Sequence, residues 1–173
     1  MTTKQFNKLS KKKQRILIAE DVLKNIKAKV IIPSSGTYIG SELSDYSGDV
    51  QEQFDKIKEC AACALGSCLL STVKFKDSLT FNELDRQGSD SKATKLLLDI
   101  FSPNQWALIE KAFEGSRYIT MWSNSGMRGH LSEEEVDKAI TFHNRYKTIK
   151  GRLIGIMKNI IQNKGIFIPN KNG

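Results

Sequence analysis

The longest uncharged stretch of the chain covers residues 60–73, between Glu59 and Lys74. At about 100° per residue, its small side chains share one face and its leucine and valine side chains cover most of the rest. A helix of this kind has no face for solvent, so other elements must surround it. Because an amphipathic period resumes at Val50, the pattern predicts a central helix over about residues 50–76.

Serine N-caps mark three further helices. We expect them over residues 11–29 with Ser10 as cap, over 92–101 with Ser91 or Asp90, and from Pro103 with Ser102 as cap and Gly115 as stop.

Two capping boxes add helix starts, because a Ser or Thr is followed three positions later by Glu. Thr80 and Glu83 begin a short helix, which residues 88–91 interrupt. Ser132 and Glu135 begin the last helix, which is expected to run to about Asn163.

Two polar segments interrupt the helical period. Residues 30–48 form a long predicted loop, in which 30–40 supply a minor strand pair together with the C-terminal tail. Residues 116–130 form a second polar loop, which contains three Ser and two Gly. Residues 165–169 are an apolar tail that is expected to dock on the domain.

Gly151 and Gly155 lie four positions apart on the last predicted helix. Two glycines in a helix cost about 2 kcal/mol of helix propensity relative to alanine, so a packing gain must offset them. We hypothesise that the small face of residues 60–71 crosses this pair closely.

The pattern predicts a mainly α fold, a single-domain bundle of five to seven helices with at most a minor strand pair. Residues 1–173 fit one domain, since this length supports one sizeable core. Residues 170–173 are expected to fray.

The net charge of +8 is concentrated at the two ends of the chain. Residues 1–30 carry nine Lys and Arg against two acids, residues 31–100 carry seven against eleven, and residues 101–173 carry eleven against six. The distribution indicates a nucleic-acid footprint, an acidic partner's docking surface, or only solvated helix faces. The candidate nucleic-acid-binding residues are Lys8, Lys11, Lys12, Lys13 and Arg15.

The two polar loops are the candidate anion site, because loops rich in Ser and Gly present backbone amides to anions. No Gly-Lys-Ser or Gly-Lys-Thr follows either loop, so a plain connecting role is the alternative. The candidate ligand-binding residues are Ser34, Ser35, Thr37, Tyr38, Ser125, Arg128 and His130.

Cys60, Cys63 and Cys68 fall within nine positions of the central predicted helix. Their spacing invites a metal interpretation with His130 or His143, but zinc sites place cysteine pairs on turns, and no second pair is present. Buried, reduced thiols are therefore expected, without a metal or a cofactor. His143 is expected to pack or hydrogen-bond, and the spacing assembles no catalytic set of residues.

Three segments of the chain resemble a group of small bacterial and phage proteins with no assigned activity. They begin at Cys60 with Cys-x-x-Cys-Ala-Leu-Gly-Ser, at Phe101 with Phe-Ser-Pro-Asn-Gln-Trp, and at Arg152 with Arg-Leu-Ile-Gly-Ile-Met-Lys-Asn-Ile-Ile. The resemblance implies a phage or mobile-element product, and it carries no activity over to this chain.

Two functions are compatible with the sequence. The first is a non-enzymatic binding protein whose basic termini or polar loops contact nucleic acid, an anionic ligand or a protein. The alternative is an enzyme acting on a phosphorylated small molecule or nucleotide, with Arg128, His130 and residues 34–38 forming its site. The lysine-rich start lacks a signal-peptide pattern and no later run is long enough to span a membrane, so we expect a location in the bacterial host cytoplasm and no membrane partner.

Overall fold

Helices dominate the computed structural model, which describes residues 1–40, 48–50, 56–76, 79–84, 91–115 and 131–169. The described helices are α1 (Thr3–Asn7), α2 (Lys11–Lys27), α4 (Ala64–Lys76), α5 (Phe81–Leu84), α6 (Lys92–Ile100), α7 (Pro103–Glu114), α8 (Glu133–Asn144) and α9 (Ile149–Gln162). The strands are β1 (Ile31–Pro33) and β2 (Cys60–Ala62). The prediction of a mainly α fold with a minor strand pair is confirmed. The predicted fraying of residues 170–173 lies outside the described part.

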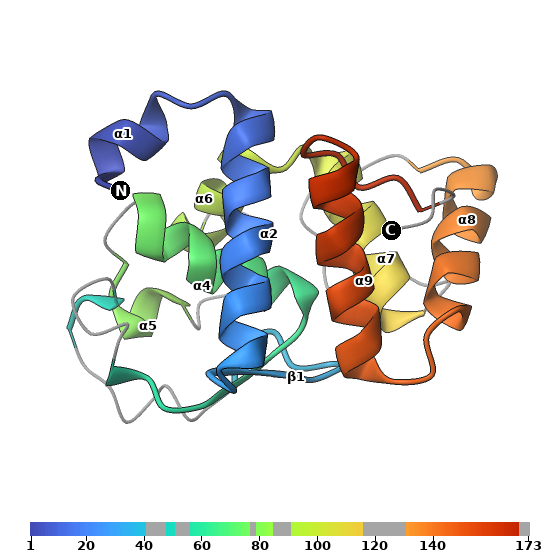
Figure 1. The fold of residues 1–173 in the computed structure, drawn as a ribbon, viewed down its shortest axis with the longest axis horizontal. Helices are drawn as coiled ribbons and strands as arrows, with labels where there is room; N and C mark the ends of the chain where they lie inside the picture. Colours follow the sequence, from blue (N-terminus) through green and yellow to red (C-terminus); the bar gives the residue numbers. More distant parts are fainter. Residues whose placement is uncertain (41–47, 51–55, 77–78, 85–90, 116–130, 170–173) are drawn as a thin grey trace.

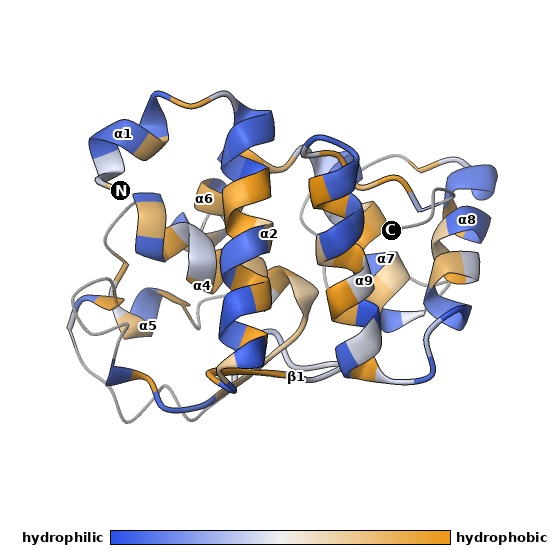
Figure 2. Cartoon of the chain, viewed as in Figure 1, coloured by the Kyte–Doolittle hydropathy of each residue, from blue (hydrophilic) through white to orange (hydrophobic). Residues whose placement is uncertain are grey.

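The helices pack in two groups that meet along α2 and α9. These two helices are in contact and run in opposite directions, with α4 and α6 behind α2 and with α7 and then α8 beside α9 (Figure 1). Hydrophilic and hydrophobic residues alternate along both (Figure 2), as expected for helices with one buried side. No helix in the described ranges is long and apolar enough to cross a membrane.

The predicted caps start the helices where the sequence places them. Each cap hydroxyl accepts a hydrogen bond from the backbone amide three residues later, which satisfies a donor that the helix leaves open. The pairs are Ser10 with Lys13, Ser91 with Thr94, Ser102 with Gln105, and Ser132 with Glu135. Gly115 ends α7 with a φ of 72°, a conformation that glycine adopts without strain.

The predicted central helix is wrong over residues 57–63. Residues 51–55 lie outside the described part, residues 57–59 are not helical, and residues 60–62 form β2. The helix begins only at Ala64. From Ala64 to Val73 every residue is buried, so the expected all-round enclosure is confirmed for α4.

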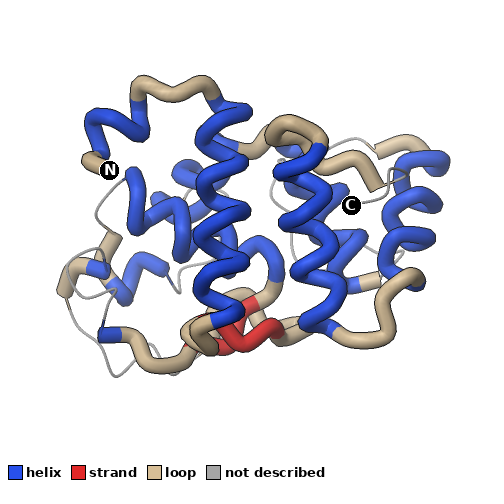
Figure 3. The backbone as a smooth tube through the Cα atoms, viewed as in Figure 1, coloured by secondary structure: helices blue, strands red, loops and turns tan. Residues whose placement is uncertain are grey.

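The strand pair forms between segments that the sequence did not pair. β1 and β2 are parallel, with Ile31 opposite Cys60 and Pro33 opposite Ala62 (Figure 3). Two backbone hydrogen bonds then tie the loop after β1 to the segment that contains β2. The Cys63 amide donates to the Thr37 carbonyl and the Gly40 amide donates to the Ala61 carbonyl, both at 2.6 Å. The C-terminal tail takes no part in this sheet.

The last predicted helix is two helices. α8 ends at Asn144 and α9 starts after Thr148, whose hydroxyl accepts a hydrogen bond from the Gly151 amide at 3.0 Å. The predicted contact between Gly155 and residues 60–71 is also wrong. A Cβ on Gly155 would instead lie 2.8 Å from Cε1 of Tyr146, so the missing side chain makes room for the ring in the turn between the two helices.

The apolar tail docks as predicted, and two side-chain amides hold its backbone. Gln105 accepts from the Phe167 amide at 2.7 Å and donates to its carbonyl at 3.1 Å. Asn159 does the same for Ile168, at 2.8 and 2.9 Å. Each amide side chain thus replaces the strand that an extended segment would otherwise need.

Candidate functional site

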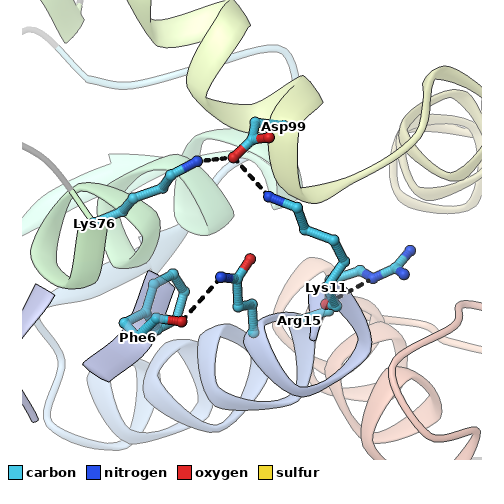
Figure 4. Close-up of polar contacts among 6 residues, drawn as sticks. Phe6, Lys11, Arg15, Lys76 and Asp99 are labelled. Carbon is cyan, nitrogen blue, oxygen red and sulfur yellow. Dashed lines mark hydrogen bonds and ion pairs between the residues drawn. The ribbon is translucent and has the colours of Figure 1, made fainter. Parts of the chain in front are cut away.

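The predicted basic residues of the N-terminus divide into two classes. Lys11 pairs with Asp99 at 2.7 Å, and Lys76 of α4 contacts the same carboxylate (Figure 4). Arg15 is half-buried and its Nε donates to the Lys11 carbonyl at 3.2 Å. Lys11 therefore helps to join α2 to α6, where Lys76 of α4 also binds, whereas the bond of Arg15 lies within α2.

Lys8, Lys12 and Lys13 are exposed, and none of them contacts a carboxylate among the described residues. Their charges are thus available to an outside partner.

The structure brings the two basic ends of the chain together. Residues 145–164, which contain α9, carry six Lys and Arg and no Asp or Glu. α9 packs antiparallel to α2, on which Glu20 is the single exposed acid. We call the exposed lysines on these two helices and beside the ends of α9, other than the paired Lys11, the basic face: Lys12, Lys13, Lys24, Lys27, Lys147, Lys150, Lys158 and Lys164.

Both helices of the basic face carry lysine and no acid in the first turn. A cation at a helix N-terminus opposes the helix dipole, at a cost of some tenths of a kcal/mol each. α8 has the opposite arrangement, with three Glu in its first turn. The lysines at the starts of α2 and α9 therefore lower the stability of these helices.

The first predicted anion loop holds an internal carboxylate. Glu114, near the end of α7, accepts hydrogen bonds from the Ser35 hydroxyl and from the Gly36 amide, the latter at 3.1 Å. Ser34 and Thr37 bond to each other at 3.2 Å, and Tyr38 is buried. Donors of this loop therefore face the carboxylate of a side chain 78 positions along the chain.

A small apolar pocket lies behind this loop, lined by Tyr38, Cys63, Glu110, Phe113 and Glu114 among others. Burial, and then the neighbouring Glu114 carboxylate, raise the pKa of Glu110 to about 7. Burial also raises the pKa of the Cys63 thiol to about 12, so this cysteine is protonated at neutral pH. Cys63 instead precedes α4 as a cap, and its sulfur accepts from the Gly66 amide at 3.5 Å.

We expect Glu110→Gln to raise the stability of the protein at pH 8 by about 1–2 kcal/mol. The folded-state pKa of about 7 lies above the ordinary value of 4.5, so the wild-type protein loses stability as pH rises through that interval. Glutamine carries no charge and avoids this loss, and its advantage should vanish near pH 4.5. Urea unfolding at pH 4.5, 6 and 8 measures the difference.

The matched control is Glu114→Gln, one turn further along α7, which weakens the bonds from Ser35 and Gly36 and should destabilise the protein at neutral pH. A Glu110→Gln variant that is no more stable than wild type at pH 8 would contradict the assignment.

The C-terminal end of α7 is held by an arginine and a histidine that spacing alone does not reveal. Arg152 Nη1 donates to the Phe113 carbonyl at 2.6 Å, and His143 Nδ1 lies 3.1 Å from the same oxygen. Burial, and then the Arg152 charge, lower the pKa of His143. The expectation that His143 forms a hydrogen bond is confirmed, and its position at a helix C-terminus suits a donor.

Ser125, Arg128 and His130 of the second predicted loop lie outside the described residues. Cys60, Cys63 and Cys68 are buried and form no disulfide bond, although only Cys68 lies on a helix. Within the described ranges, no three His, Cys, Asp or Glu side chains are placed to hold a metal ion. Comparison with protein-family models, curated proteins and solved structures finds no match to this chain.

Proposed function

We propose that this protein is a non-enzymatic nucleic-acid-binding protein that uses the basic face of α2 and α9. The observation that carries the proposal is the contact between α2 and α9, which brings exposed lysines from opposite ends of the chain together. A surface with eight exposed lysines and one exposed acid on α2 attracts polyanions, and lysines bind phosphates through counterion release.

The N-terminal lysines of both helices support this role. Lys13 and Lys150 lie in first turns, where acids would stabilise the helices and lysines do not. A residue that costs folding stability at an exposed position is explained by a partner that it binds. The exposed acids Glu133 and Glu134 lie on α8, which is a different helix from the two that carry the lysines of the basic face.

The binding role is better supported than an enzyme acting on a phosphorylated small molecule. In that alternative the donors of residues 34–38 would face a ligand phosphate, whereas Ser35 and Gly36 face Glu114. The resemblance to bacterial and phage proteins supports a phage-associated or mobile-element product that acts in the cytoplasm of a bacterial host. A nucleic acid is then an available partner.

The test replaces one lysine in the first turn of each helix, as Lys13→Glu with Lys150→Glu. At about 50 mM salt, we expect the affinity for a 24-base-pair DNA duplex, measured by fluorescence anisotropy, to fall at least tenfold, or by about 1.4 kcal/mol. The same variant should be about 1 kcal/mol more stable than wild type, since both acids favour the helix dipole and Glu at position 13 completes a capping box with Ser10. Loss of binding with a gain in stability excludes unfolding as the cause.

The control is Lys58→Glu with Lys95→Glu, which changes the net charge equally at exposed positions outside the basic face. Its affinity should stay within threefold of wild type. Equal losses of DNA affinity in the two variants would show that the basic face is not the binding surface. Wild-type protein that binds no DNA or RNA at low salt, or that binds anionic phospholipid vesicles in preference, would contradict the function itself.

A further inference from the structure

We infer that the basic face binds the backbone of duplex nucleic acid without reading its sequence; this inference rests on the proposed function. Its first support is the chemistry of the two helices. Residues 11–27 and 149–162 contain no aromatic residue. Single-strand binding proteins gain affinity by stacking bases on aromatic side chains, and neither helix of this face supplies such a platform.

One described aromatic side chain lies beside the start of α9, and it is not available for stacking. Tyr146, in the turn before α9, is half-buried, lies against the ring of Phe142 with centroids 5.2 Å apart, and covers Gly155. The other described aromatic side chains are buried or half-buried in the core. The face therefore offers ammonium groups, and these bind phosphates rather than bases.

The width of the face also argues against reading base edges. Each helix is about 10–12 Å across with its side chains, and packed helices lie about 8–10 Å apart. The pair is thus about 20 Å wide, whereas the major groove of B-DNA is about 12 Å wide. Two helices side by side are therefore too wide to enter the groove and contact the phosphate backbones instead. A duplex favours such contacts because it presents about one charge per 1.7 Å of length, against one per 3.4 Å for a single strand.

The length of the face sets the size of the binding site. α2 has 17 residues and therefore spans about 25 Å at 1.5 Å per residue. At about 3.4 Å per base pair, this length matches about seven base pairs. A duplex of 24 base pairs should then accept about three copies of the protein.

The experiment compares wild-type protein on two 24-base-pair duplexes of unrelated sequence, on a 24-residue oligothymidine and on a mixed-sequence single strand, at three salt concentrations. We expect the two duplexes to bind within twofold of each other and both single strands to bind at least fivefold more weakly. As the salt concentration rises, the affinity for the duplexes should fall more steeply than the affinity for the single strands. In the Lys13→Glu, Lys150→Glu variant the preference for duplex should shrink along with the affinity.

Three outcomes would overturn this inference while leaving the proposed function intact. They are single strands that bind as tightly as duplexes, tenfold discrimination between the two duplexes, or a duplex preference that the variant retains in full. Absence of binding to all four probes at low salt would instead overturn the proposed function. The two failures are therefore distinguishable in one set of titrations.

Discussion

Gly66→Ala will lower the free energy of unfolding by about 4 kcal/mol, which is a large fraction of the stability of a domain of this size. A Cβ at this position would lie 2.7 Å from the carbonyl carbon of Tyr38 and closer still to its oxygen, with Cγ1 of Ile39 at 3.1 Å. The obstacle is backbone, which a change of rotamer does not move. To make room, the loop must shift and strain the bonds from Cys63 to Thr37 and from Gly40 to Ala61.

Gly155→Ala is the matched control, because its Cβ also meets a neighbour at short range. Here the neighbour is the far end of the Tyr146 ring, which is half-buried and rotates away at modest cost. We expect a loss of about 1–2 kcal/mol, within the range for overpacked side chains.

A second substitution at the neighbouring tyrosine should restore stability to one glycine variant and not to the other. Tyr146→Leu should relieve Gly155→Ala, so that the double variant is more stable than the sum of the single effects implies. Tyr38→Leu should give no relief to Gly66→Ala, because it leaves the carbonyl in place. Thermal unfolding of the six variants decides the comparison, and a Gly66→Ala protein as stable as Gly155→Ala would contradict the close approach.

Local signals predicted most of the helix starts. A cap such as Ser102, followed by Pro103 and closed by Gly115, acts through bonds within one turn, so the relevant atoms are adjacent in sequence. The enclosure of α4 was also predictable, since an uncharged helix must be surrounded. These features depend on few residues, and each is visible in a window of about ten positions.

The failures involve partners that are distant in sequence. Residues 60–62 read as helix because Cys-Ala-Ala has no strand signature, and they become β2 because Val30 and β1 offer backbone partners. Gly155 was paired with the wrong neighbour because its contact depends on how the chain turns. Tyr146 lies only nine positions before it, but meets it only because the chain turns between α8 and α9.

In the candidate site, too, local features were visible in the sequence and contacts between distant segments were not. The charge at both ends of the chain was visible in the sequence, but the antiparallel contact between α2 and α9 that joins the two ends was not. The donors of residues 34–38 were predicted as well, and their partner Glu114 was not. The bond from Arg152 of α9 to the end of α7 was not predictable from the sequence. A buried arginine on a helix resembles a surface residue until its acceptor is known.

Asp21→Ala is expected to be the second most damaging substitution, with a loss of about 3–4 kcal/mol. Asp21 of α2 is buried and accepts three bonds, from Asn25 at 2.8 Å, Ser71 at 2.9 Å and Lys74 at 2.7 Å. Alanine leaves these donors without their acceptor at the contact between α2 and α4. Lys74 is partly exposed, with 26% of its side chain accessible, so most of the cost comes from the buried donors of Asn25 and Ser71, which lose their acceptor.

A double-mutant cycle with Lys74→Met tests this explanation of Asp21. Removing both charges should recover at least 1 kcal/mol relative to the sum of the single losses, since no ammonium group is then left without its carboxylate. Lys138→Ala provides the surface control, because its pair with Glu134 spans one turn of α8 in solvent and should contribute about 0.5 kcal/mol or less. If Asp21→Ala costs no more than Lys138→Ala, the network does not hold α2 against α4. The basic face depends on the position of α2, so a nucleic-acid affinity that falls with Asp21→Ala and returns in the double variant would connect this buried network to binding.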